Sequence, residues 1–203
     1  IEEKVLDKNT KFCYNYDTLS RVTERTVKNA ATEAVISTET FTYDAAGNIT
    51  GGSADDTFVY DTNNRLASAD GVAVTYDLDV NMTFASADGT NYSGTFDSHN
   101  RLVSMRGHTY TYDTQSVRIK DLCDDVETTF VYDTNSKLSK LLVKTTGDVT
   151  TKYVYGRGLI GEESANTFKT YHFDYRGSTV AITDATGAVT DTFAYDTYGK
   201  LIT

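Results

Sequence analysis

The sequence predicts an all-β protein in which consecutive antiparallel β-hairpins lie side by side. Three observations predict this fold class. A Tyr-Asp or Phe-Asp dipeptide recurs along the whole chain of 203 residues, a second aromatic residue usually stands two positions before it, and no segment sustains a 3.6-residue period. The composition agrees, because 15 Tyr and 9 Phe occur with no Pro and no Trp, and aromatic residues fit a pleated, half-buried surface.

The aromatic pairs predict the strands. One residue separates the two aromatic residues of a pair, as in Tyr14 and Tyr16, and this spacing puts both rings on one face of a strand. A helix would place the two rings about 200° apart. The pairs are Tyr14/Tyr16, Phe41/Tyr43, Phe58/Tyr60, Tyr110/Tyr112, Phe130/Tyr132, Tyr153/Tyr155, Tyr171/Phe173 and Phe193/Tyr195.

The aromatic residue of each dipeptide is the predicted structural core of its repeat. Cross-strand aromatic pairs stabilise a sheet by about 0.2–1 kcal/mol each. We therefore expect seven of these rings to lie on one sheet face, largely buried against neighbouring repeats: Tyr43, Tyr60, Tyr76, Phe96, Tyr112, Tyr132 and Tyr195. Tyr155 precedes Gly156 instead of Asp and belongs to a degenerate copy, where residues 156–158 suggest a local bend or bulge. The core aromatics are Tyr16, Tyr43, Tyr60, Tyr76, Phe96, Tyr112, Tyr132, Tyr155, Phe173 and Tyr195.

An aspartate follows nearly every core aromatic and predicts a turn. A polar stretch such as Asp61-Thr62-Asn63-Asn64-Arg65 comes next, and an aliphatic residue often stands six positions past the ring, as Leu66 does. This succession is typical of a β-hairpin. The aspartate can accept backbone hydrogen bonds, and Asn or Gly later in the loop tolerates positive φ. The turn aspartates are Asp17, Asp44, Asp61, Asp77, Asp97, Asp113, Asp133, Asp174 and Asp196.

A basic residue often closes the loop. We interpret it as half of a weak, exposed charge pair with the turn aspartate, which contributes at most about 1 kcal/mol. These basic residues are Arg21, Arg65, Arg101, Lys137 and Lys200.

Composition narrows the function classes. The net charge is −10, with 29 acidic and 19 basic residues, so a nucleic-acid partner is not expected. No run of about 18 apolar residues occurs, so no membrane insertion is expected.

The two cysteines, Cys13 and Cys123, show no zinc-binding spacing. A distant disulfide between them is one interpretation, and two unrelated thiols is the favoured one. The first residues do not resemble a signal peptide, and we expect an interior fragment whose export signal lies outside it.

No catalytic residue, cofactor or metal site is predicted. Asp121, Asp124 and Asp125 surround Cys123, but their spacing fits no catalytic template and favours an acidic outer loop. The glycine-rich segments 51–53 and 156–161 precede no helix, which disfavours phosphate binding. An acidic stretch lacks the twelve-residue pattern of a calcium loop, although a lone calcium ion in that turn stays an open alternative. The residues of that acidic stretch are Asp77, Asp79, Asp88 and Gly89. We interpret the histidines as ordinary turn or strand residues; they are His99, His108 and His172.

The stretch from Tyr60 to Leu66 resembles the YD repeat of Rhs proteins, wall-associated proteins, insecticidal toxin-complex components and teneurins. The C-terminal segments 171–179, 183–187 and 195–199 are similar to the opening of the Rhs repeat-associated core. This resemblance divides the chain into a YD-repeat array over residues 1–168 and the beginning of that core over residues 169–203.

The resemblance implies a curved, spiralling YD-repeat sheet that is part of a hollow shell. The implied role is a non-catalytic scaffold in a secreted or cell-surface protein, and the implied partners are the remainder of the parent shell and the C-terminal toxin or effector that it encapsulates. The family's self-cleaving aspartyl site belongs to a core segment that these residues do not include, so the chain is not expected to cleave itself. The alternative is an extracellular adhesion module that binds carbohydrate through exposed aromatic rings.

The expected shape is a curved, open strip, because neighbouring strands are rotated by about 20–25°. Its end strands would present unpaired backbone groups, and no Pro is available to interrupt them. We therefore expect self-association through edge strands.

Overall fold

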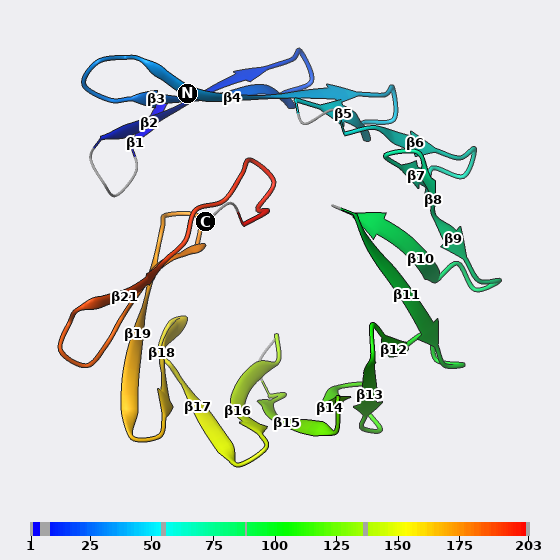
Figure 1. The fold of residues 1–203 in the computed structure, drawn as a ribbon, viewed down its shortest axis with the longest axis vertical. Coiled ribbons are helices and arrows are strands. Elements are labelled where there is room, and N and C mark those ends of the chain that lie inside the picture. The colour runs from blue at the N-terminus through cyan, green and yellow to red at the C-terminus, as the bar shows by residue number, and fades with distance from the viewer. Residues whose placement is uncertain (1, 5–8, 54–55, 88, 136–137, 202–203) are drawn as a thin grey trace. The chain divides into compact units, whose positions relative to one another are not determined.

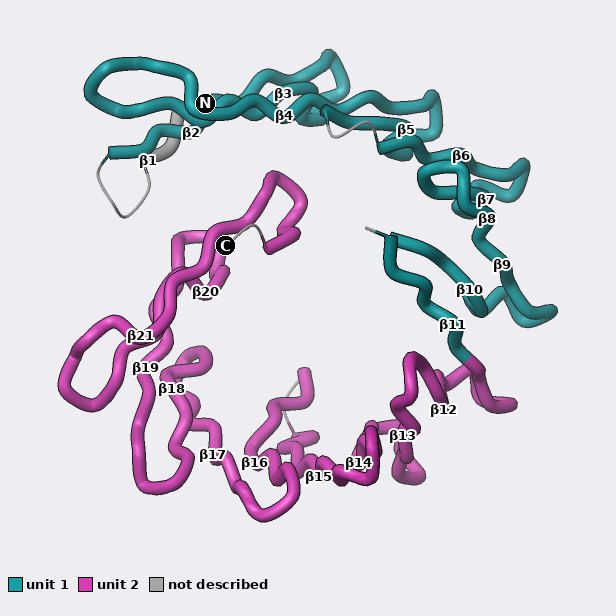
Figure 2. The backbone as a smooth tube through the Cα atoms, viewed as in Figure 1, with its two compact units in different colours: residues 1–94 teal, residues 95–203 magenta. Residues whose placement is uncertain are grey.

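The computed structural model describes residues 2–4, 9–53, 56–87, 89–135 and 138–201, with the backbone alone for residues 2–4. Within these ranges the ordered elements are β-strands, and no helix occurs, as the sequence predicts (Figure 1). The described part of the chain accordingly contains no helix that is long and apolar enough to cross a membrane. The chain divides into two compact units, residues 1–94 and residues 95–203 (Figure 2).

Unit 1 is a succession of antiparallel hairpins. Its first sheet has the order β1-β2-β3-β4-β5, and a three-stranded sheet has the order β6-β7-β8. The strand β10 then pairs with β9 and β11. The bounds are β1 Glu2–Lys4, β2 Thr10–Tyr16, β3 Val22–Asn29, β4 Val35–Tyr43, β5 Ile49–Gly52, β6 Phe58–Tyr60, β7 Leu66–Ala69, β8 Val72–Ala73, β9 Thr75–Tyr76, β10 Met82–Ala87 and β11 Thr90–Phe96, whose last two residues belong to unit 2.

Unit 2 continues the same pattern from β12 to β21. From β12 onward each strand pairs antiparallel with the strand that follows it in sequence, as far as β21. The bounds are β12 Leu102–Met105, β13 His108–Tyr112, β14 Arg118–Cys123, β15 Val126–Asp133, β16 Lys140–Thr146, β17 Val149–Tyr155, β18 Leu159–Ser164, β19 Thr167–Phe173, β20 Thr179–Thr183 and β21 Val189–Thr192.

A β-bulge marks almost every predicted core aromatic. The register of the hairpin shifts by one residue between that aromatic and the residue before it, as between Val59 and Tyr60. The extra residue lies on the returning strand, since Tyr60 pairs with Leu66 whereas Val59 pairs with Ser68. The same shift occurs at Tyr16, Tyr43, Tyr76, Tyr112, Tyr132, Tyr155 and Phe173. A bulge bends a strand and increases its twist, so each repeat adds a bend at the same place.

The core aromatics are less buried than the sequence analysis expects. Most are half-buried, while Tyr16 and Phe173 keep 44% and 41% of their surface exposed, and no large side chain in the described ranges is fully buried. The reason is that strands contact mainly their neighbours along the chain, so within a unit the rings pack sideways in a single sheet layer. The seven rings expected to be largely buried are all half-buried, so the expected degree of burial is not reached in the chain by itself.

Three of the buried side chains lie in the first sheet, and Arg25 is the most enclosed side chain of the described ranges. Tyr14 is 9% exposed and Arg25 only 3%. The Arg25 guanidinium lies 4.2 Å from the centre of the Phe12 ring, and its Nη1 donates a hydrogen bond of 2.9 Å to Glu39 Oε1. Pairing with a carboxylate and a ring offsets the cost of burying this charge.

The glycine-rich segment 156–161 is part of the degenerate repeat. The bulge predicted there lies at Tyr155, and the Gly156 amide donates to the Gly158 carbonyl at 2.9 Å. Gly161 on β18 is buried, and a Cβ atom at this position would collide with the Lys169 carbonyl oxygen and come within 2.8 Å of the Phe168 ring. Glycine at residue 161 is thus required by the close approach of β19.

Candidate functional site

The repeated Tyr-Asp turn recurs with the same geometry along the chain, and the turn at Asp61 shows it in full. The Asp61 amide donates to the Arg65 carbonyl at 2.8 Å, and the Asn64 amide donates to the Asp61 carbonyl at 3.0 Å. Asp61 Oδ1 accepts hydrogen bonds of 2.9 Å from the amides of Asn63 and Arg65. Asp61 Oδ2 accepts one of 2.8 Å from Arg65 Nε. The carboxylate therefore organises the entire loop.

The same backbone arrangement holds for most predicted turn aspartates. In each of these turns the aspartate amide donates to the carbonyl four residues on, and Oδ1 accepts from the amide at that position. These turns begin at Asp17, Asp44, Asp61, Asp77, Asp97, Asp113, Asp174 and Asp196. For Asp133 the structure gives only the hydrogen bond from the Asn135 amide, because residues 136–137, including the predicted closing residue Lys137, lie outside the described residues.

One further turn of this kind was not predicted. Asp184 Oδ1 accepts hydrogen bonds from the amides of Thr186 and Ala188, in the loop between β20 and β21. Thr183 replaces the core aromatic before it, so a search for Tyr-Asp or Phe-Asp does not find this turn. The Gly187 three residues after the aspartate is the signal that could have indicated it.

The residue three positions after the aspartate adopts positive φ in every such turn. Gly occupies this position at Gly47, Gly177, Gly187 and Gly199, and Asn occupies it at Asn64 and Asn100, as the sequence predicts. Ser20 and Ser116 occupy it in two further turns, with φ of 63° and 62°, and in the turn at Asp77 the β-branched Val80 has a φ of 68°. A β-branched side chain in this region is a source of backbone strain.

Hydrogen bonding lowers the pKa of six of the turn carboxyl groups among the described residues, those of Asp17, Asp44, Asp61, Asp77, Asp97 and Asp184. The Arg101 side chain, followed by the amides of Arg101 and His99, holds the pKa of Asp97 at about 2 instead of 3.8, although partial desolvation opposes the shift. In Asp17 and Asp61 the largest cause of a lowered pKa is the backbone amide of the closing arginine. The carboxylates are therefore held in the ionised form, which suits an acceptor of several hydrogen bonds and not a general acid.

Several core tyrosines connect their hairpin to the one before it. The Tyr60 hydroxyl donates to the Ile49 carbonyl at 3.0 Å, and Ile49 stands six positions past the preceding core residue Tyr43. Tyrosines elsewhere repeat this contact at 2.6–2.9 Å. The further donor and acceptor pairs are Tyr43 to Val22, Tyr76 to Leu66, Tyr112 to Leu102 and Tyr195 to Thr179.

Other predicted core aromatics make ring contacts without this hydroxyl bond. Phe96 and Phe173 have no hydroxyl group, and in the described part of the chain Tyr16, Tyr132 and Tyr155 donate no such bond. Tyr16, Tyr132 and Phe173 instead pack against the first ring of their own pairs, with centroids 6.2–6.5 Å apart. The predicted aromatics thus share a strand position but not a single set of contacts.

The closing arginines are more buried than the sequence interpretation expects, and they make a contact that it did not include. The side chains of Arg21, Arg65 and Arg101 are only 25–35% exposed, and each is paired with its turn aspartate. Each guanidinium also lies over the ring of the next core tyrosine, at 4.5, 4.9 and 5.0 Å from the centres of the rings of Tyr43, Tyr76 and Tyr112. The predicted pairing with the turn aspartate is therefore present, but the description of these pairs as exposed is wrong for these three residues. Sequence reasoning missed the ring contact with the following repeat.

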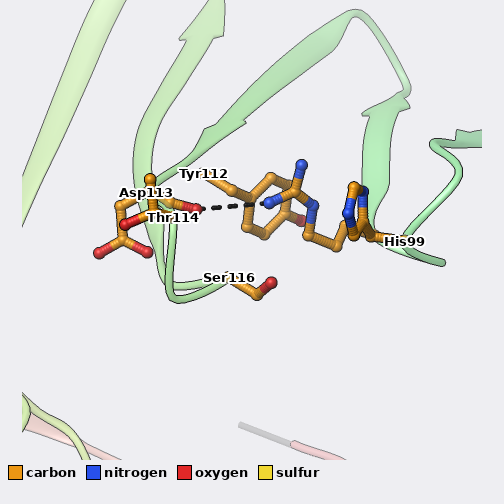
Figure 3. Close-up of a pocket in the computed structure, with 6 residues that line it drawn as sticks. His99, Tyr112, Asp113, Thr114 and Ser116 are labelled. Carbon is orange, nitrogen blue, oxygen red and sulfur yellow. Dashed lines mark hydrogen bonds between the residues drawn. The ribbon is translucent and has the colours of Figure 1, made fainter.

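A hollow of about 570 Å³ lies between two successive turns of unit 2 (Figure 3). It is lined by His99, Arg101, Tyr112, Asp113, Thr114 and Ser116. Arg101 Nη1 donates a long hydrogen bond of 3.4 Å to the Asp113 carbonyl, shown as the dashed line, while the Asp113 carboxylate points away from the tyrosine ring. That carboxylate accepts hydrogen bonds from the amides of its own turn, so the lining offers no paired acid and base.

The remaining chemical candidates occupy structural positions. Cys13 and Cys123 are both free thiols. Burial and the neighbouring Asp124 raise the pKa of Cys123, which keeps its thiol protonated and a poor nucleophile. His108 Nδ1 lies 2.8 Å from Asp121 Oδ1. Among the described residues no three His, Cys, Asp or Glu side chains are grouped as metal ligands, and Asp88 lies outside those residues.

Two kinds of known protein resemble the chain. The teneurin YD-shell family model matches residues 1–203. The structure of the Photorhabdus luminescens Tc holotoxin pore aligns over 99% of this chain, with 12% identity and a TM-score of 0.57. The crystal structure TcdB2-TccC3-Cdc42 aligns over 99% of this chain, with 13% identity and a TM-score of 0.48.

The chain spans only 15% of the length of each of these two structures. At 12% identity, the similarity to the holotoxin pore shows a shared fold alone. No curated protein matches in sequence.

Proposed function

Because the chain belongs to the teneurin YD-shell family, we propose that it forms part of the wall of a β-sheet shell and has a structural, non-catalytic role. The observation that carries this proposal is the bulge at nearly every core aromatic. A bend repeated at the same point of each hairpin gives a sheet a consistent curvature, which a wall around a cavity requires.

The contacts between repeats support a wall of fixed register. A tyrosine hydroxyl bound to the carbonyl of the preceding hairpin fixes the offset of two hairpins, and the arginine over the next ring adds a second contact between them, as Arg65 does with Tyr76. The aspartate carboxylates accept hydrogen bonds from groups of their own turns. Within the described residues, these recurring polar groups therefore bind one another, which supports a structural role.

We further propose that the complete wall encloses a C-terminal toxin or effector domain of the same secreted or cell-surface protein. The similarity to a Tc holotoxin pore supports a toxin assembly, and the 15% coverage of that chain leaves room for other segments to complete the wall. Carbohydrate binding is less well supported, since arginine side chains cover ring faces of Tyr43, Tyr76 and Tyr112 on which a sugar would stack.

Limited proteolysis of the full-length parent protein tests this function. The C-terminal domain should resist a protease when the repeats are intact and should become sensitive when Asp61→Ala and Asp97→Ala together disrupt two turns. Arg157→Ala, at an exposed residue outside these turns, is the control and should keep the protection. Equal cleavage of the C-terminal domain in the intact protein and in the turn variant would contradict enclosure.

A further inference from the structure

Three Asn-x-Ser/Thr sequences, the acceptor pattern for N-linked glycans, occur in unit 1. They are Asn48-Ile49-Thr50, Asn81-Met82-Thr83 and Asn91-Tyr92-Ser93. The pattern alone does not distinguish between them. The structure does, because the three asparagine side chains have different partners.

Asn48 and Asn81 close two of the aspartate turns at the position that arginine occupies elsewhere. Asn48 Nδ2 donates to Asp44 Oδ2 at 2.8 Å and to Asn64 Oδ1 at 2.6 Å, so both of its N–H groups are used. Asn81 Nδ2 donates to Asp77 Oδ2 at 2.9 Å. A sugar on either nitrogen would replace an N–H and place a bulky group where the turn is closed.

The hydroxyl groups of the same two sequences are also engaged. Thr50 and Thr83 form hydrogen bonds with Thr42 and Thr75 on the adjacent strands, at 3.1 and 2.9 Å. These contacts hold the bulge of each repeat. In both sequences the asparagine and threonine side chains are therefore already engaged in hydrogen bonds of the folded hairpin.

Asn91 has a different setting. It lies on β11, where residues alternate between the half-buried Tyr92 and the exposed Asn91 and Ser93. In the described part of the chain neither Asn91 nor Ser93 uses its side chain in a hydrogen bond. A substituent on Asn91 would leave the sheet on the face opposite Tyr92 and Phe96 without displacing a contact.

We propose that Asn91 is an N-glycosylation site and that Asn48 and Asn81 are not acceptors in the folded protein. In the transfer, Asn91 Nδ2 forms a bond to C1 of an oligosaccharide carried on a lipid diphosphate. The bond between C1 and the diphosphate oxygen breaks, the lipid diphosphate leaves with the electron pair, and the amide nitrogen gives one proton to a base of the transferase.

The test is translation of the full chain behind a signal peptide in the presence of microsomes. Protease digestion then separates folded from misfolded molecules, and mass spectrometry after treatment with a peptide N-glycosidase in H₂¹⁸O identifies each occupied asparagine. The protease-resistant fraction should carry glycan at Asn91 alone. Asn91→Gln should abolish glycosylation of that fraction and leave its protease resistance unchanged.

Three outcomes would overturn the proposal. They are an unmodified Asn91, a protease-sensitive product whose only glycan is on Asn91, and a protease-resistant product with glycan on Asn48 or Asn81. Modification of the last two residues confined to the protease-sensitive fraction supports the proposal, because the glycan would have prevented closure of those turns.

Discussion

A single hydroxyl group at the core tyrosine joins neighbouring hairpins in five of the repeats. The strand β6, which carries Tyr60, has few contacts with β5 of the previous hairpin. The Tyr60 hydroxyl adds a hydrogen bond to the Ile49 carbonyl of that hairpin. Phenylalanine at the same position, as in Phe96, supplies the ring without the bond. The two functions of this residue, packing and hydrogen bonding, can therefore be separated by mutation.

Tyr60→Phe should destabilise the protein by about 0.5–1.5 kcal/mol, because the substitution removes one hydrogen bond and keeps the ring. Urea denaturation followed by circular dichroism measures the change. Tyr132→Phe is the matched control, since the Tyr132 hydroxyl makes no such bond within the described residues, and it should change stability by less than about 0.5 kcal/mol. Equal effects of the two substitutions would show that the hydroxyl bond does not hold the repeats together.

Val80→Asn should stabilise the protein by about 1 kcal/mol, because Val80 has a φ of 68° and asparagine tolerates this region better than a β-branched residue. The reverse substitution Asn64→Val, at the same position of another turn, should destabilise by more than this amount, because it also removes the hydrogen bond from Asn48 Nδ2 to Asn64 Oδ1. Thermal unfolding of the two variants checks both signs. A lower melting temperature for Val80→Asn would mean that the valine side chain makes a compensating contact.

At the scale of the hairpin, the aspartate turn and the bulge act together. The sequence predicts the turn, because Asp, Asn and Gly carry their conformational preferences locally. It also predicts the strand face from the spacing of two aromatic residues. The ring contact of Arg65 was missed because it joins residues of different repeats, and the degree of burial was overestimated because the number of sheet layers is not a local property. The turn at Asp184 was missed because its aromatic residue is replaced by Thr183.

The turns should weaken in acid. Since the pKa of Asp97 is about 2 in the folded protein and near 3.9 when unfolded, the ionised carboxylate stabilises the fold above about pH 4, and this contribution is lost as the pH falls towards 2. Urea midpoints measured between pH 2 and 6 should therefore fall at the acid end. Asp97→Asn should lower the midpoint at pH 6 and show a smaller acid decrease than the original chain. An identical acid decrease in both proteins would contradict this assignment.

Gly161→Ala should cost about 1–3 kcal/mol, because the added methyl group meets the Lys169 carbonyl oxygen and the Phe168 ring and forces β18 and β19 apart. Gly158→Ala is the control, since its Cβ would have no neighbour within 4 Å, and it should have little effect. The urea midpoints of the two variants measure this difference. If Gly161→Ala has the same midpoint as the original chain, β18 and β19 can move apart without loss of stability.

At the scale of the whole molecule, the important property is the edge that β21 presents. Within the described part of the chain β21 pairs only with β20, and all four of its residues are exposed. A longer wall would cover such an edge with its next hairpin. The isolated chain has the same backbone groups available to another molecule.

We therefore expect the chain to self-associate through β21, with an average mass in sedimentation velocity that rises with protein concentration. Val189→Lys should shift this equilibrium towards the monomer, because Val189 is 62% exposed on the edge strand and a lysine there opposes pairing. Val154→Lys adds the same charge at a 40% exposed position on the interior strand β17, so association should persist in this control. If the original chain stays monomeric at all concentrations, the edge is closed in solution; if both lysine variants reduce association equally, net charge and not the β21 edge controls it.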